Sequence, residues 1–402
     1  MKKSLAPLAL GGFGIGMTEF VMMGILPDVA TNLSISIPQA GYLISAYALG
    51  VVIGAPTLVA LMARRGPKEV LVWLMMLFAL TNAVSALAPN FHVLMLCRFL
   101  AGLPHGAFFG VGAVVASRLA DKGKVAAAVA SMFTGLTLAN VVGVPFGTWL
   151  GHNGSWRMVF LLVAVIGIAT VLLLKRWVPH FDPAPSAGFR HDLKIFRRPG
   201  LWLAMAITSI GTGGFFASLS YIAPLLTDMA HFSAATIPLI MTLIGVGMTV
   251  GVILGGKLAD KVAPIKSIAI LLSIMATLLM LNALLAHSQP AILLLAFATG
   301  ANALALGPSI QMLLMDHSRD AEMLGSSLGQ SGFNIGNAMG AFLGGIPLTL
   351  GYNYASPQWV AAVLALCGGG RGAHDGGTAK AGIRHGRQAK AGRRRRIGAA
   401  ID

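Results

Sequence analysis

Long apolar stretches fill this chain, and only brief polar breaks separate them. Most stretches approach the ~20 residues that an α-helix needs to cross the hydrocarbon core of a bilayer. A helix satisfies its own backbone hydrogen bonds in lipid, so the pattern predicts an all-α membrane protein. The twelve expected spans cover residues 5–26, 40–62, 70–88, 92–115, 125–151, 157–174, 201–226, 234–256, 266–286, 290–314, 323–350 and, shortened, 357–368.

The chain also repeats itself at a fixed offset of 197 residues, with no gap. Proline and asparagine take part, since Pro27 matches Pro224 and Asn140 matches Asn337. Such a repeat in an apolar chain is typical of transporters, which hold substrate between two copies. We therefore expect an N-terminal six-helix bundle over residues 1–176, a cytoplasmic linker over 177–200 and a C-terminal six-helix bundle over 201–368.

The end of the chain departs from the repeat. The twelfth span should match the sixth, but its apolar run stops at Leu366 and gives way to Gly-, Ala- and Arg-rich sequence. Residues 369–402 are expected to form a disordered basic tail, either natural or, as we favour, the product of a reading-frame change in a GC-rich gene. A shortened helix predicts a protein less stable than an intact relative.

Composition supports lipid as the solvent of this chain. It is 56% hydrophobic and 10% charged, with a mean hydropathy of +0.78, whereas soluble domains carry about 25% charged residues. The net charge of +16 is no nucleic-acid footprint, because alternating spans place nearly all basic residues outside the tail on one side. Only Arg157 falls on the other side. This asymmetry predicts an inner-membrane protein with both termini in the cytoplasm.

Several motifs resemble those of the major facilitator superfamily. The loop Leu61–Lys68 is similar to its basic loop after the second span, although Ala63 stands where the family has an acid, and Gly256–Lys261 is the counterpart that keeps the acid. The fourth span, with Arg98, Gly102, Gly106 and Gly110, resembles the family's Arg-led helix. The resemblance implies a two-bundle fold that works by alternating access, with a conformational latch formed by Arg64, Gly66, Lys68, Arg118, Asp260 and Lys261.

Three further motifs narrow the resemblance. Thr18-Glu19-Phe20, the run Pro104–Gly110 and the element Gly143–Thr148 are together similar to the drug:proton antiporter branch, and within it to arabinose and sugar-efflux transporters of the AraJ type. This implies a proton-coupled exporter of sugars or small amphipathic compounds. A broad-specificity drug exporter and an uptake symporter remain alternatives.

Glu19 is the only acid of thirteen inside an apolar span, and Arg98 is the only basic residue well inside one. A charge there costs on the order of 2.5–3.5 kcal/mol, which marks both as functional candidates. Burial favours the protonated form of a carboxyl group, whereas a nearby guanidinium favours the carboxylate. A carboxyl group under both influences can take up and release a proton. We favour proton coupling by Glu19, Arg98 and His105. A static Glu19–Arg98 clamp and a packing role for His105 are the alternatives.

The repeat assigns this pair to one half, because Glu19 matches Phe216 and Arg98 matches Leu295. We therefore expect the second half to supply mainly substrate surface. The candidate substrate-binding residues are polar side chains within spans, which either bind substrate or join helices by hydrogen bonds: Tyr47, Asn140, Tyr221, Asn302, Gln330, Asn334 and Asn337. Small residues at intervals of four predict close helix packing, with a kink at the proline: Gly102, Gly106, Gly143, Pro145, Gly147, Gly340 and Gly344.

Other classes of protein fit the sequence less well. No span carries a nucleophile with a base and an acid, or clustered metal ligands, so we expect neither an enzyme nor a metal site. A channel differs from a carrier in giving large currents that do not saturate. The expected partners are protons, a small-molecule substrate and the lipid bilayer, with no cofactor, no nucleic acid and a monomeric state.

Overall fold

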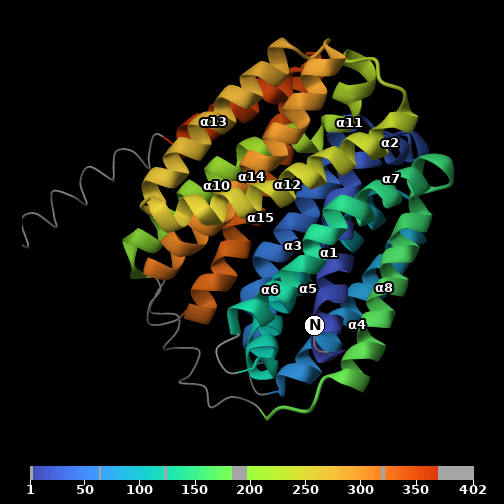
Figure 1. Cartoon of the computed structure of the whole chain (residues 1–402). Coiled ribbons are helices and arrows are strands. Elements are labelled where there is room, and N and C mark those ends of the chain that lie inside the picture. The colour runs from blue at the N-terminus through green and yellow to red at the C-terminus, as the bar shows by residue number, and fades with distance from the viewer. Residues whose placement is uncertain (1–2, 63–64, 122–124, 183–196, 318–321, 370–402) are drawn as a thin grey trace, which may run out of the picture.

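The computed structural model describes residues 3–62, 65–121, 125–182, 197–317 and 322–369, and every regular element within these ranges is helical (Figure 1). The first half contains α1 (Ala6–Gly24), α2 (Leu26–Leu33), α3 (Ile37–Leu61), α4 (Pro67–Ala86), α5 (Phe91–Leu119), α6 (Val125–Leu138), a π-helical turn (Ala139–Gly143), α7 (Val144–Asn153) and α8 (Trp156–Trp177). The second contains α10 (Pro199–Ser220), α11 (Ile222–Pro224), a π-helical turn (Leu225–Met229), α12 (Ile237–Lys261), α13 (Pro264–Leu284), α14 (Gln289–His317), α15 (Glu322–Thr349) and a helix over residues 356–369. Short 3₁₀ turns cover Lys3–Leu5 and Ala234–Thr236.

Ten membrane-crossing candidates occur in the described ranges, by length and apolar character. Their outward sides carry bare hydrophobic residues. On α8, Leu161, Val165, Ile168 and Leu172 recur at helical spacing and are each more than half exposed. A stripe of that kind suits lipid rather than water. The α15 helix and the helix over 356–369 are outside the set of ten, so the expected count of twelve spans stays a prediction. Residues 370–402, with most of the expected tail, lie outside the described ranges.

The sequence repeat reappears as a repeat of backbone geometry. The first helix breaks after Gly24, and α2 continues the helical path to Leu33. In the second half α10 ends at Ser220, and Tyr221, the repeat counterpart of Gly24, separates it from α11. A proline follows the break in both halves, Pro27 two residues after Ile25 and Pro224 three residues after Tyr221. The halves differ at Ala139–Gly143, because the matching residues of α15 are continuous α-helix.

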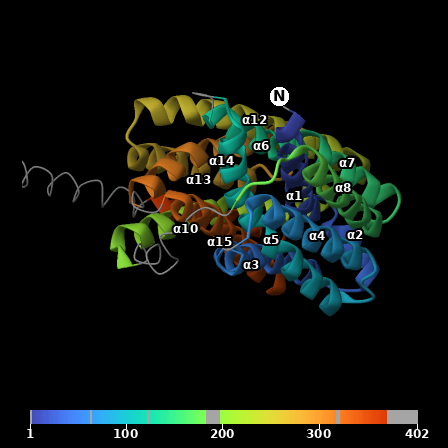
Figure 2. The same cartoon turned by 90° about the horizontal axis from the view of Figure 1, so that it is seen from below.

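The two halves lie side by side in both views, the first coloured blue to green and the second yellow-green to red (Figure 2). We name the face where α1 begins the N-terminal face and the other the opposite face. Near the opposite face, α3 and α15 are joined by a hydrogen bond from Ser45 Oγ to the Ala338 carbonyl at 3.0 Å. The rings of Tyr42 and Phe342 stack there, 5.8 Å apart. Toward the N-terminal face, a cavity of about 180 Å³ separates α3 from α10 and α15.

Glycine lets α3 and α5 approach to backbone contact inside the first half. A Cβ added at Gly102 would overlap the carbonyl oxygen of Tyr47, and one at Gly50 would overlap that of Phe99. Larger residues at either position would push the helices apart. The close approach brings Tyr47 over the buried side chain of Arg98, so it builds the candidate site as well as the fold.

Candidate functional site

Glu19 lies deep in the protein, where the two halves meet. Its side chain is 3% exposed, and the next residue, Phe20, stacks on Phe216 of α10 with ring centroids 6.3 Å apart. Within the described residues, no group donates a hydrogen bond to its Oε1 atom. A buried polar atom without a partner is uncommon and calls for an explanation. A role in binding a proton, or in accepting a hydrogen bond from a ligand, would explain the unpartnered oxygen.

Arg98 is fully buried on α5, and its guanidinium lies within electrostatic range of the Glu19 carboxyl. The hydrogen bonds of the guanidinium, however, go to Thr18, the residue before Glu19. Nη1 donates to Thr18 Oγ1 at 2.9 Å, and Nη2 donates to the Thr18 carbonyl at 3.0 Å. Thr18 Oγ1 in turn donates to Asn82 Oδ1 at 2.9 Å. Among the described residues, therefore, the guanidinium is not clamped onto Glu19 through hydrogen bonds.

Tyr47 connects Arg98 with His105. The guanidinium carbon of Arg98 lies 4.3 Å from the centroid of the Tyr47 ring, which is cation–π geometry. The Tyr47 hydroxyl lies 3.2 Å from Nδ1 of His105, one or the other donating. His105 is 1% exposed and packs against Phe109. Tyr47 was predicted to bind substrate, but the structure places it in the same cluster as the three candidate proton-coupling residues.

The second half brings buried amides toward this cluster. Asn337 on α15 lies beside the Glu19 carboxyl. Both of its amide atoms lack hydrogen-bond partners within the described residues, and so does Oδ1 of Asn334. Both side chains are fully buried. The Nδ2 atom of Asn334 donates to the Gln330 carbonyl at 3.0 Å. Unused donors and acceptors at the boundary between the halves are what a polar ligand requires.

The other predicted substrate residues lie elsewhere or use their polar atoms within the fold. Asn302 donates to the Leu271 carbonyl at 2.9 Å and so joins α14 to α13. Tyr221 donates to the Ala341 carbonyl at 2.6 Å, near the opposite face. Asn140 donates to Leu136 O at 3.1 Å within its own helix. Its backbone carbonyl contacts Gly245 of α12. A substrate role for these residues stays a prediction.

The predicted packing glycines face neighbouring helices. Gly106 faces Ala55, Gly143 faces Phe13 and Gly147 faces Val21, all within the first half. In the second half Gly340 faces the Gly213 carbonyl and Gly344 faces Ala217. Pro145 is in the first turn of α7, directly after the π-helical turn.

Two of the predicted latch residues contact the end of α8 and the beginning of the linker. Lys68 Nζ donates to the Lys175 carbonyl at 2.9 Å, in the last turn of α8. Arg118 donates to the Asp182 carbonyl at 3.0 Å and lies over the Phe181 ring. Both bonds stay on the side of the first half. The remaining candidates are Gly66, which precedes α4, and Lys261, which ends α12; Arg64 and the side chain of Asp260 lie outside the description.

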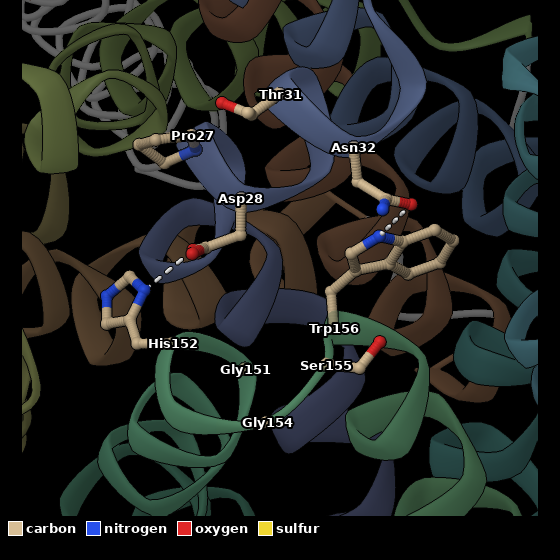
Figure 3. A pocket seen from close by; sticks show the side chains of 9 residues that line it. All are labelled: Pro27, Asp28, Thr31, Asn32, Gly151, His152, Gly154, Ser155 and Trp156. Carbon is tan, nitrogen blue, oxygen red and sulfur yellow. Dashed lines mark hydrogen bonds and ion pairs between the residues drawn. The ribbon is translucent and has the colours of Figure 1, made fainter.

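A separate polar pocket of about 350 Å³ opens near the opposite face (Figure 3). Asp28 of α2 pairs with Nδ1 of His152 of α7 at 2.7 Å. Asn32 Oδ1 accepts hydrogen bonds from Trp156 and Arg157. All of these residues belong to the first half. The pocket therefore ties α2 to α7 and α8, away from the boundary where Glu19 and Asn337 meet.

Thr18 and Asn82 did not emerge from the sequence as candidates, because a single buried hydroxyl or amide is common in membrane helices. The repeat contains a signal that finds them. Their counterparts are Phe215 and Leu279, so both positions are polar in the first half only. Glu19 and Arg98 follow the same rule.

Together, the two repeated halves and the ionisable cluster buried between them define a multi-pass membrane carrier. The chain belongs to the major facilitator superfamily, whose family model matches residues 8–340. It is 41% identical over 366 residues to "Putative transporter AraJ" of Escherichia coli (strain K12), covering 91% of this chain and 93% of the relative. It is 40% identical over 361 residues to "Inner membrane transport protein YdhP" of the same strain, covering 90% and 92%.

A more distant relative is "Chloramphenicol resistance protein" of Streptomyces lividans, 31% identical over 362 residues, with 89% of this chain and 92% of the relative covered. Among solved structures, the POT family transporter PepTSo superposes with a TM-score of 0.77 over 94% of this chain and 99% of that one. Its 12% identity makes this a likeness of fold alone. The chain is thus a membrane transporter with the major facilitator fold.

Proposed function

We propose that this chain is a proton-coupled secondary transporter of the inner membrane that exports sugars, of the arabinose type, or small amphipathic compounds. The observation that carries the proposal is the Glu19 carboxyl, buried between the halves with an unpartnered oxygen, beside Arg98 and facing the unpartnered amide of Asn337. Burial favours the neutral acid and the guanidinium favours the carboxylate. Movement of the halves that changes the balance would change whether the proton is held.

Alternating access gives the proton its direction. By the positive-inside rule, the basic loops favour a cytoplasmic location for the N-terminal face. The contacts at the opposite face then close the periplasmic side of this conformation, and Glu19 would exchange its proton with the cytoplasm. A substrate that binds at Asn337 and Asn334 would compete with the proton at Glu19. Competition of this kind produces antiport.

The choice of substrate rests on the relatives. One relative is named only as a putative transporter, AraJ, and the name of another refers to chloramphenicol resistance. Amides that can donate and accept suit a polyhydroxylated sugar, whereas the aromatic residues Phe20, Phe216 and Phe333 around them also suit an amphipathic drug. A broad-specificity drug exporter is accordingly the second candidate, and an uptake symporter is the third.

Everted membrane vesicles with a pH-sensitive dye test the proposal. After energisation, addition of a transported compound should release protons from the vesicle lumen in a saturable manner. L-Arabinose, other pentoses and hexoses, and chloramphenicol form the first panel. Saturable release with a sugar supports the sugar exporter, and release with chloramphenicol alone supports the drug exporter. Proton-independent transport of any panel member would contradict the coupling.

Replacing Asn337 with Ala should weaken substrate binding about tenfold, because one buried hydrogen bond contributes ~1–1.5 kcal/mol. Asn334→Ala should act in the same direction. The measurement is the concentration dependence of the proton signal for the panel member that gives one. Asn282→Ala is the matched control, since this buried amide of the second half already donates to Thr299 at 3.1 Å. Unchanged substrate affinity together with lost proton coupling would contradict a substrate role for these amides.

A further inference from the structure

The Nη1 and Nη2 atoms of Arg98 both donate to a neutral residue although a carboxyl lies nearby, and Nε has no hydrogen-bond partner within the described residues. The planar fork of an arginine side chain matches the two oxygens of a carboxylate. Here the fork meets two oxygens of Thr18, the hydroxyl at 2.9 Å and the main-chain carbonyl at 3.0 Å. Thr18 therefore takes the place that a paired carboxylate would occupy.

Asn82 gives the Thr18 hydroxyl its direction. The Nδ2 atom of Asn82 donates to the Phe78 carbonyl at 2.8 Å, one turn earlier on α4. This bond turns Oδ1 toward Thr18, whose only hydroxyl hydrogen goes to it. A hydroxyl has one hydrogen and two lone pairs, so the lone pairs of Thr18 face Arg98. The order of donors runs from Arg98 through Thr18 to Asn82, and every link is buried.

In this arrangement of the described residues, Glu19 interacts electrostatically with Arg98 but forms no direct ion pair with it. Three titratable side chains surround the carboxyl: Arg98, Tyr47, which interacts with it electrostatically, and His105 behind Tyr47. The helices α10 and α15 contribute Phe216 and Asn337 on the other side. A bidentate Glu19–Arg98 pair would hold the carboxylate in its charged form. Keeping the guanidinium on Thr18 avoids that.

The second half carries a pseudo-symmetric copy of these positions with every polar group removed. Thr18, Glu19, Asn82 and Arg98 correspond to Phe215, Phe216, Leu279 and Leu295. All four counterparts are buried, none more than 6% exposed. All four positions are thus polar in the first half and apolar in the second. A scaffold role alone would not require the polar set, because the apolar set fills the equivalent space in the second half.

We propose that Thr18 and Asn82 are positioning residues, which hold Arg98 apart from Glu19 and thereby set the pH at which Glu19 takes up its proton. The inference rests on the proposed proton coupling. It adds two residues whose side chains are fully buried. It also assigns them a measurable effect on protonation that does not depend on the identity of the substrate.

Infrared difference spectroscopy of the full chain, purified and returned to lipid bilayers, provides the test with protons as the only ligand. The band of the protonated carboxyl is assigned to Glu19 by its loss in Glu19→Gln, and its midpoint is followed with pH. In Thr18→Val the guanidinium loses its hydroxyl partner and pairs with Glu19, so the midpoint should move to lower pH by at least about 1 unit. Thr18→Ser should restore the wild-type midpoint.

The second half supplies a matched control. Thr299→Val breaks a buried hydroxyl–amide contact between α13 and α14 of the second half, and its midpoint should stay at the wild-type value. If Thr18→Val does not fold, Asn82→Leu, which introduces the residue found at position 279, should shift the midpoint in the same direction. An unchanged midpoint, or one moved to higher pH, in a folded variant overturns the inference. If the midpoint shifts as expected in Thr18→Val and Asn82→Leu, but Glu19→Gln still carries out proton-coupled transport, the proposed function is overturned instead.

Discussion

Replacing Glu19 with Gln should reduce proton-driven transport to background while the chain still folds and binds substrate. Glutamine has nearly the same size and keeps hydrogen-bonding atoms, but it cannot carry a proton. Proton release on addition of substrate to everted vesicles should therefore disappear. Exchange of labelled for unlabelled substrate, which needs no net proton movement, should persist. The two measurements together separate loss of coupling from loss of binding.

The control for this prediction is Glu69→Gln. Glu69 is exposed in the first turn of α4, so its removal subtracts the same charge outside the buried cluster. It should leave proton release at the wild-type level. If Glu19→Gln also releases protons at the wild-type rate, Glu19 takes no part in the mechanism. The clustering around Thr18 would then be structural.

The helical architecture was predictable because each span must satisfy its backbone internally and present apolar residues to lipid. The spacing of apolar runs and the 197-residue repeat therefore predicted the fold class, and the family model and relatives confirm it. The details at the helix ends were less accessible. The sequence predicted one span over 5–26, whereas the helical path breaks after Gly24 and continues to Leu33. Polar residues of α2 therefore extend the helical path beyond the apolar span that the sequence marks.

The candidate site was only partly predictable, for a related reason. Residue type marks Glu19 and Arg98, because an ionisable group in lipid is costly wherever it points. Residue type does not reveal which atoms meet. The fork of Arg98 engages Thr18, and the Tyr47 ring packs on the guanidinium. Both contacts depend on how α1 and α3 are rotated about their axes. The sequence does not specify this rotation, because these apolar spans carry polar residues on several sides.

Linking α3 to α15 near the opposite face should stop transport completely. The stacked rings of Tyr42 and Phe342 join the halves there, 5.8 Å apart, and alternating access requires these halves to separate. Tyr42→Cys and Phe342→Cys are introduced together in a background lacking Cys97 and Cys367, the two free cysteines. A short bifunctional thiosulfonate reagent then links them. Proton-coupled transport should fall to background and return on reduction, as measured in the same vesicles.

A link inside one half distinguishes separation of the halves from general stiffening. Phe109 of α5 and Phe133 of α6 also stack, with ring centroids 5.1 Å apart, and both belong to the first half. Cysteines at these two positions, linked in the same way, should leave most of the transport intact because the halves still move as units. Transport that continues after Tyr42→Cys and Phe342→Cys are linked would mean that this interface stays closed throughout the cycle. Access to Glu19 would then change by motion within a half, and the contacts around Ser45 and Ala338 would be a permanent joint.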